Sequence, residues 1–352
     1  MNVPPSERKE TFLARYPRKL KLAVTGCLLL VLLSPFLVPS RDGSEAERPD
    51  TAVNSPSEPA GPITSSPAAD TRPSDPQAMS LNDTDDLGAR MARAPDDSLT
   101  EETGEGPLPK IGVDGRKPWQ VYARPFNNAD RRPRIAIVIM DVGLSSGVSD
   151  AALRRLPGNV TLAFDAQSPA AGAWLERARQ DGHETLLSVP MEPFDYPHSD
   201  PGPNTLLTNV PDGDNLRRLS LALRRGTGYV GITTPSGSRF TTTPDKLTPV
   251  LEALRNRGLM VFDVRVAPHS VLKDLAKQIK VPVAASTQRI DRNPAPEAID
   301  SALDQLEQTA RLNGRAVGVA SSLPVTLDRL EPWIKGLPSR GIALAPLSAV
   351  VE

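Results

Sequence analysis

From about Arg134 onward, short apolar runs alternate with amphipathic stretches, and this alternation constrains the fold more than any other feature of the sequence. Each run is continuous instead of alternating with polar residues, which is typical of strands in a parallel sheet covered on both faces. The amphipathic stretches between them predict helices, several of which end in Gly after basic residues. The apolar runs are IAIVIM, VTLAF, TLLSV, YVGIT, LMVFDV, VPVAA, AVGVA and IALAPL.

Strands that alternate with helices in this way predict one α/β domain. The number of strands favours a (β/α) barrel, and an open doubly wound sheet is the alternative. A dinucleotide site has little support, because no GxGxxG follows the first strand and DVGLSSG is the nearest match. A formal net charge of -1 gives no electrostatic reason to expect a nucleic-acid partner, which calls for a clearly basic face.

The N-terminal part has a different character. Residues 1–21 are polar and basic and are predicted to form a cytoplasmic segment, whereas residues 22–38 are uncharged, mostly apolar and long enough to span a bilayer as a helix. We interpret 22–38 as a retained transmembrane signal anchor, because no clear A-x-A site follows; a cleaved signal peptide is the alternative. Cys27 lies too early in this run to favour a lipoprotein site, and a single cysteine excludes an intramolecular disulfide.

Residues 39–115 are rich in Pro, Ser, Asp and Glu and contain few large apolar residues. Such a segment cannot bury enough surface to offset its ordering entropy, so we predict a disordered linker. The globular domain is predicted for residues 116–352. It starts with KPWQVYARPFNN, whose aromatic residues we expect to pack on the domain as an arm instead of forming a separate binding motif.

In a barrel of this kind, residues just past the C-terminal ends of the strands form the site. Here these positions hold carboxylates and hydroxyls but no histidine. Arg239, next to Ser238 in the loop GITTPSGSRFT, is the side chain most expected to meet an anionic or polyhydroxyl ligand, and it could equally clamp the loop to backbone carbonyls. The other strand-end residues are Asp141, Asp165, Glu192, Thr233, Thr234, Asp263, Arg265, Asp291, Ser321 and Ser322.

These segments also carry a family resemblance. In chain order, IVIMDVGLS, LPGNVTLAFDAQSP, GHETLLSVPMEPFDYPHSDPGPNTL, VGITTPSGSRFT, RGLMVFDVR and GVASSLPVTLDRL resemble the divergent polysaccharide deacetylase family of bacterial envelopes. That family is a branch of the NodB-like metal-dependent carbohydrate esterases. The resemblance covers the chain from Arg134 onward. It implies a distorted (β/α) barrel, and with the predicted anchor it places the domain in the periplasm, held at the bacterial inner membrane.

The departures from the family pattern concern its chemistry. The resemblance implies an Asp-Asp pair after the first strand, one the catalytic base and the other a metal ligand, and here Met140 stands at the base position before Asp141. Ser188 and Pro235 stand where the family has histidines, and Ser321 lies in the segment that replaces its late Gly-His-Pro motif. A catalytic zinc site needs about three protein ligands, and methionine cannot accept a proton. These replacements predict an inactive site.

The three histidines of the chain do not restore the lost ligands in an obvious way. His183 follows a helix in DGHE, where a turn or a buried hydrogen bond is the favoured interpretation. His198, in DYPHSDPGP, is a weak candidate for a substitute metal ligand together with Asp141 and Glu192. His269 is expected to be an exposed residue near a helix start. For Asp263 and Arg265, a structural ion pair and a ligand-recognition role are both open.

We therefore expect a membrane-anchored, periplasmic, polysaccharide deacetylase-like protein that is catalytically inactive and binds a cell-wall glycan or an envelope protein partner. The expected ligand-binding residues are Asp141, Glu192, Ser238, Arg239, Asp263 and Arg265. No cofactor is expected, and zinc or another divalent metal only if the site has been rebuilt. The alternatives are an active carbohydrate deacetylase with a rebuilt metal site, and an envelope adaptor whose linker makes the contacts.

Overall fold

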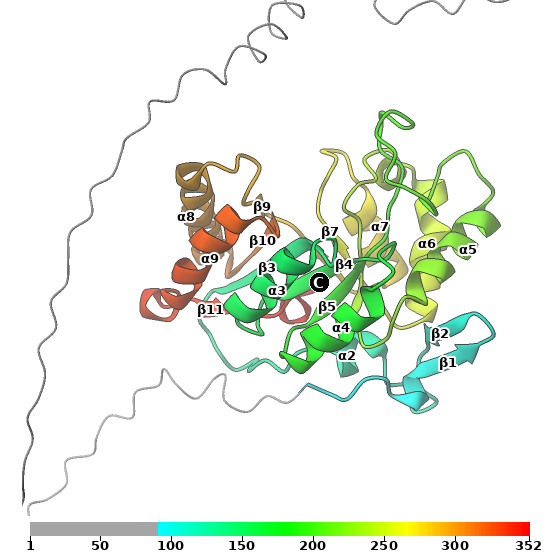
Figure 1. Ribbon diagram of the computed structural model, residues 1–352, viewed down its shortest axis with the longest axis horizontal. Coiled ribbons are helices and arrows are strands. Elements are labelled where there is room, and N and C mark those ends of the chain that lie inside the picture. Colours follow the sequence, from blue (N-terminus) through cyan, green and yellow to red (C-terminus); the bar gives the residue numbers. More distant parts are fainter. Residues whose placement is uncertain (1–90) are drawn as a thin grey trace, which may run out of the picture. The chain divides into compact units, whose positions relative to one another are not determined.

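The computed structural model describes residues 91–352, and element labels follow Figure 1. Its main feature is a parallel sheet in which neighbouring strands follow the order β8-β7-β6-β5-β4-β3-β10-β9, with β11 paired to β3 as well. Every predicted apolar run overlaps one of these strands. The strands are β3 (Arg134–Val142), β4 (Thr161–Asp165), β5 (Thr185–Ser188), β6 (Gly231–Thr233), β7 (Met260–Asp263), β8 (Val283–Ala285), β9 (Gln288–Arg289), β10 (Arg315–Ser321) and β11 (Ala343–Leu344).

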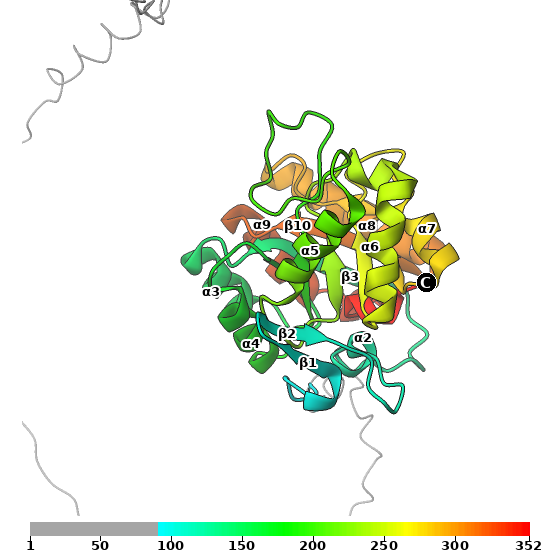
Figure 2. The ribbon, with the colours of Figure 1, turned by 90° about the vertical axis from the view of Figure 1, so that its right-hand side faces the viewer.

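Helices follow most of the strands and lie around the sheet, with α8 and α9 near one end and α5, α6 and α7 near the other (Figures 1 and 2). The predicted helix ends are confirmed where Gly can adopt a left-handed conformation, as Gly314 does with φ 75° after α8. The helices are α2 (Pro118–Val121), α3 (Ser146–Arg155), α4 (Ala171–Gln180), α5 (Asp212–Leu223), α6 (Pro244–Asn256), α7 (Leu272–Ile279), α8 (Pro296–Asn313) and α9 (Pro324–Lys335).

Both faces of the sheet are buried, which explains the continuous apolar runs. In β3, Ile135, Ile137 and Ile139 belong to a core shared with the helices. The intervening residues of the strand belong to a second core, which also holds Tyr122 and Leu347. Because successive side chains of a strand point to opposite faces, a strand between two cores needs apolar residues at every position.

The sheet is curled but open, and the prediction of a barrel therefore holds only in part. Among residues 91–352, no strand pairing joins β8 to β9, the two ends of the sheet. The last apolar run does not close it either, since Ala343 and Leu344 of β11 pair with Arg134 and Ile135 at the start of β3. The residues that follow form the 3-10 helix η6 (Leu347–Val350), whose apolar side chains fill the second core.

Residues 91–126 form an N-terminal arm that packs on the sheet domain. It contains a hairpin of β1 (Thr100–Thr103) and β2 (Gly106–Pro109), which lies beside α5 (Figures 1 and 2). The composition predicts a linker up to residue 115, whereas the structure has this hairpin within that range. Tyr122 is buried and Trp119 and Phe126 pack against the same core, which confirms the prediction that these aromatic residues form an arm on the domain.

The arm is held by a buried arginine of α4. The guanidinium of Arg179 donates hydrogen bonds to the carbonyls of Ala92 at 2.6 Å, Tyr122 at 3.0 Å and Gly228 at 2.7 Å. Burial lowers the pKa of Arg179 to about 10, which still leaves it charged at neutral pH. One side chain therefore connects both ends of the arm to the strand region of β6.

The predicted membrane anchor at 22–38 lies outside the described residues. Within residues 91–352, no helix combines the length and apolar character needed to cross a bilayer.

Candidate functional site

The parallel strands place their C-terminal ends at one edge of the sheet, where the predicted site residues follow. At this edge β3 has a β-bulge, because its register with β4 shifts between Ile139 and Val142. Asp141 lies in the bulge with φ 62°, a left-handed conformation that Asp tolerates better than most residues. Within the described chain no hydrogen bond or ion pair reaches its carboxylate, and the Ser322 hydroxyl donates to its backbone carbonyl at 3.4 Å.

Glu192 and Arg239 clamp the loops after β5 and β6 to each other. One oxygen of the nearly buried Glu192 carboxylate accepts from the Thr208 backbone N–H at 2.5 Å and from its hydroxyl at 2.7 Å, while the other lies 3.2 Å from Nε of Arg239. Arg239 also donates to the carbonyl of Phe194 at 2.7 Å, and its guanidinium lies 5.8 Å from that ring's centroid. The Ser238 hydroxyl accepts from the Phe194 backbone N–H at 2.9 Å.

These contacts give Glu192, Ser238 and Arg239 a structural role, which the sequence leaves open for Arg239 and does not predict for Glu192 and Ser238. Of the two possibilities for Arg239, the structure shows the clamping one, in which its side chain holds the backbone carbonyl of Phe194. Its side chain remains 44% exposed, so part of the guanidinium still faces solvent.

Asp263 and Arg265 meet through the backbone. Oδ1 of the buried Asp263 accepts from the N–H of Arg265 at 2.8 Å, and Oδ2 accepts from the Ser270 hydroxyl at 3.1 Å. Burial raises the pKa of Asp263, and these hydrogen bonds together with the charge of Arg265 oppose the rise. Arg265 is held at φ 55°, and its side chain extends to the wall of a cavity of about 490 Å³ next to Asp263.

A third network joins the ends of β9 and β10. The buried Asp291 carboxylate accepts from the backbone N–H of Ser321 at 2.6 Å and from Nε of Arg289 at 2.8 Å. Arg289 in turn donates to the Ser321 hydroxyl at 2.6 Å. Ser321 of this network belongs to the segment that, by the family resemblance, is expected to replace the late Gly-His-Pro motif.

Two buried hydroxyls at the same edge lack partners. Ser188 at the end of β5 is 4% exposed and Thr234 just after β6 is fully buried, and neither side-chain oxygen has a hydrogen bond within residues 91–352. The two strand ends are neighbours, because Ser188 pairs with Thr233 across β5 and β6. Buried polar groups without partners are uncommon, and a bound water is the ordinary way to satisfy them.

The described residues do not gather the donors of a divalent metal site. Nowhere between residues 91 and 352 do three or more His, Cys, Asp or Glu side chains come together in a suitable group. His198 is exposed on the loop after β5, and the proposed set with Asp141 and Glu192 does not form. The donor set therefore does not fit zinc, which is held by about three protein ligands in a catalytic site.

The other histidines have simpler positions. His183 is fully buried, its Nδ1 lies 2.8 Å from the carbonyl oxygen of Val160, and burial lowers its pKa. This confirms the predicted hydrogen-bonding role. His269 is exposed in the loop before α7, as the sequence predicts.

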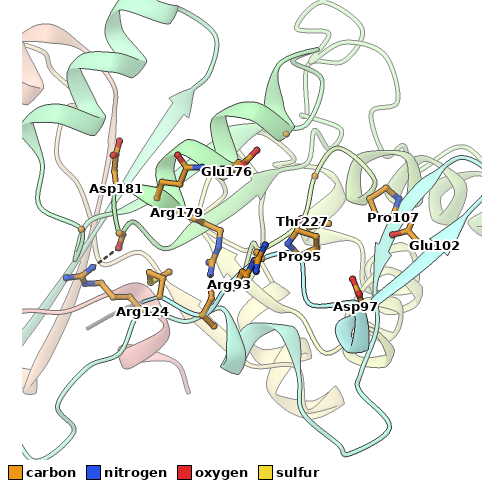
Figure 3. A pocket seen from close by; sticks show the side chains of 18 residues that line it. Arg93, Pro95, Asp97, Glu102, Pro107, Arg124, Glu176, Arg179, Asp181 and Thr227 are labelled. Atoms are coloured by element: carbon orange, nitrogen blue, oxygen red, sulfur yellow. Dashed lines mark hydrogen bonds between the residues drawn. The ribbon is translucent and has the colours of Figure 1, made fainter. Parts of the chain in front are cut away.

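A larger cavity of about 1540 Å³ lies at the opposite ends of the strands, between the arm and α4 (Figure 3). Its lining includes the cations Arg93, Arg124 and Arg179 and the acidic residues Glu176 and Asp181. Arg179 and Arg124 donate to backbone carbonyls there, Arg124 to that of Gly182 at 2.7 Å. These side chains hold the arm, and the loops with free functional groups lie at the other edge. We therefore place the candidate site at the C-terminal edge despite its smaller cavity.

The sequence profile of the divergent polysaccharide deacetylase family matches residues 137–351, which is most of the folded domain. The chain belongs to this family. Its curled parallel sheet and the order of its strand-end motifs agree with the NodB-like fold that the sequence predicts. Membership establishes the ancestry of the site but leaves its present chemistry to the residues that occupy it.

Three relatives are informative. An uncharacterized protein of Haemophilus influenzae is 26% identical over 211 residues, which is 58% of this chain and 72% of that protein. The uncharacterized protein YibQ of Escherichia coli is 24% identical over 205 residues, 58% of this chain and 63% of YibQ. A crystal structure of an uncharacterized protein from Agrobacterium tumefaciens is 38% identical with a TM-score of 0.68, and the match covers 70% of this chain and all of that one.

Several side chains at this edge were not singled out from the sequence. Arg289 bridges Asp291 to Ser321, Thr208 provides both donors to one oxygen of Glu192, and Arg292 and Lys273 line the cavity beside Asp263. The sequence signal for Arg292 is a basic residue shortly after a strand end, whereas Lys273 lies at the start of α7. No local sequence pattern identifies Thr208, because its partner Glu192 lies at the other end of the loop.

Proposed function

We propose that this protein is a carbohydrate-binding member of the divergent polysaccharide deacetylase family that does not hydrolyse its ligand. The observation that carries the proposal is the donor set at the C-terminal edge. By the family resemblance, Met140, Ser188, Pro235 and Ser321 stand where the family has its base, metal ligands or acid, and no group of three metal donors forms within residues 91–352. Without such groups neither an activated water nor a protonated leaving group is available.

The same edge retains features that suit a sugar. Four large apolar side chains are exposed on the loops after β3, β5, β7 and β10, at the edge where the strand-end residues lie. Among them, Phe194 is 54% exposed and offers a ring to the C–H face of a sugar. Asp141 offers an unpaired carboxylate for sugar hydroxyls. The four apolar residues are Leu144, Phe194, Val266 and Leu323.

The proposed setting is the bacterial periplasm. The apolar residues 22–38 would anchor the chain in the inner membrane, and residues 39–90 are rich in Pro, Ser and acidic residues, a composition suited to a tether. A cell-wall glycan is therefore the proposed ligand. Fusing a reporter that is active only outside the cytoplasm after residue 90 tests this topology, and a reporter without activity would contradict it.

A metal and activity assay tests the central proposal. The full-length chain, purified in detergent, would be loaded with zinc, manganese or cobalt, desalted and measured for bound metal and for release of acetate from N-acetylglucosamine oligomers. We expect no stoichiometric metal and no acetate release, together with measurable oligomer binding. Metal that is lost in Asp141→Ala but kept in the control Asp304→Ala, with acetate release, would show instead that the site has been rebuilt.

A further inference from the structure

The cavity beside β7 has an unusual set of charges for a sugar-binding cleft. Five charged residues line its volume of about 490 Å³, and three of them are cations. Asp263 lies at its inner end, where the strand stops. The other four charges come from three separate segments, namely the loop after β7, the start of α7 and the loop after β9. They are Arg265, Lys273, Asp274 and Arg292.

Asp263 does not neutralise these cations by direct contact. Its two oxygens accept hydrogen bonds from the backbone N–H of Arg265 and the hydroxyl of Ser270, and no salt bridge joins it to a cation within residues 91–352. Its carboxylate therefore fixes the loop in which Arg265 takes its left-handed backbone conformation. Because backbone strain at a loop persists only when surrounding contacts impose it, this arrangement holds Arg265 at the cavity wall.

Two of the cations are available to a ligand. The side chains of Arg265 and Arg292 are exposed, and neither makes a hydrogen bond or salt bridge with another described residue. Lys273 is partly committed, since its Nζ lies 3.0 Å from a carboxylate oxygen of Glu352. Asp274 is exposed and its charge is open to solvent, which weakens its effect on the two arginines.

We propose that this cavity binds the carboxylate of an acidic sugar, with Arg265 and Arg292 as the direct contacts. The inference rests on the proposed glycan-binding function and deepens it, because it specifies a carboxylate-bearing ligand over a neutral one. Guanidinium groups suit this role, since their planar donors can form two parallel hydrogen bonds to one carboxylate. Cations that converge from separate loops also favour an acidic sugar over a neutral one, because a neutral sugar leaves them without a partner.

Three disaccharides that differ in one group test the inference. They are N-acetylglucosaminyl-N-acetylmuramic acid, the same compound with its lactyl carboxylate converted to a methyl amide, and the N-acetylglucosamine disaccharide. Their dissociation constants would be measured by calorimetry on the full-length chain in detergent at low salt. We expect the acid to bind about tenfold more tightly than the amide. Raising the salt to about 0.5 M should reduce this preference, because the cations are exposed.

Substitutions in the cavity then test whether it causes the preference for the acid over the amide. Arg265→Gln and Arg292→Gln should each bring the acid and the amide closer together, and the double variant should make them equal while the neutral disaccharide binds as before. Arg217→Gln, which removes one exposed charge from α5, is the matched control and should keep the full preference. Equal binding of acid and amide by the unaltered protein would overturn this inference alone. Failure of all three disaccharides to bind would instead remove the proposed function beneath it.

Discussion

Replacing Glu192 by alanine should destabilise the domain, because this side chain connects two loops. The substitution removes both hydrogen bonds to Thr208 and the ion pair to Arg239. Bonds to a charged acceptor contribute about 1.5 kcal/mol or more each when buried, but Thr208 is half-buried and water can replace part of the loss. Arg239 is 44% exposed, so the ion pair adds only about 0.5 kcal/mol.

The expected loss is therefore about 2–3 kcal/mol of unfolding free energy, which corresponds to about 5–10 °C in Tm for a domain of this size. Urea unfolding followed by circular dichroism measures the first quantity. Thr208→Val, which removes the hydroxyl and keeps the backbone N–H, should cost about 1 kcal/mol. In the double variant the two costs should not add, because both changes remove the same hydrogen bond.

This prediction separates a structural role for Glu192 from a ligand-binding role. If Glu192 mainly contacts ligand, alanine should weaken glycan binding and leave the unfolding free energy unchanged. Glu192→Gln sharpens the comparison, since it can still accept a hydrogen bond from Thr208 but loses its charge. Unchanged stability in the alanine variant would refute the clamp argument, whatever happened to binding.

Three further changes test other parts of the fold. Burial lowers the pKa of His183, so below about pH 6.5 the unfolded chain binds a proton that the folded chain does not. The free energy of unfolding should therefore decrease as the pH is lowered through this range, by at most about 1.4 kcal/mol per pH unit. His183→Gln should remove this contribution when unfolding is measured at several pH values. Arg179→Met should raise amide hydrogen exchange in the N-terminal arm about tenfold. A Cβ on Gly231 would lie 2.1 Å from the carbonyl oxygen of Met260, so Gly231→Ala should cost about 3 kcal/mol or more in urea unfolding, while Gly213→Ala, which meets nothing, should not.

The sequence predicts the sheet well because burial on both faces leaves a local mark. The run from Ile135 to Met140 is apolar at every position, and the structure shows why, with one core on each side of β3. Closure of the sheet leaves no such mark. The last apolar run reads as a full strand, yet only Ala343 and Leu344 pair, and the next residues fill a core. Both outcomes bury apolar side chains, so hydrophobicity does not distinguish them.

For the candidate site, the positions of residues at strand ends predict where the site lies better than they predict which side chains contact one another. The sequence leaves open an ion pair between Asp263 and Arg265, but the structure has a hydrogen bond to the backbone N–H of Arg265 instead, and the Arg265 side chain lines the cavity. Arg292 follows Asp291 directly in sequence, and only the folded loop places it on the same cavity as Arg265. Which side chains share a cavity depends on loop geometry, and that is set by hydrogen bonds between residues distant in sequence.

The carboxylates at the C-terminal edge differ in the structural contacts that they make. Glu192 joins two loops, Asp263 fixes the turn after β7, and Asp291 joins the ends of β9 and β10. Their presence follows from the stability of the loops, and no catalytic role is needed to explain them. Asp141 differs, because its carboxylate has no partner among the described residues while its backbone is left-handed, a conformation that glycine or asparagine adopts at least as easily. The contacts of the described residues therefore assign this carboxylate no structural role, and Asp141 is the strand-end carboxylate that we propose for contact with sugar hydroxyls.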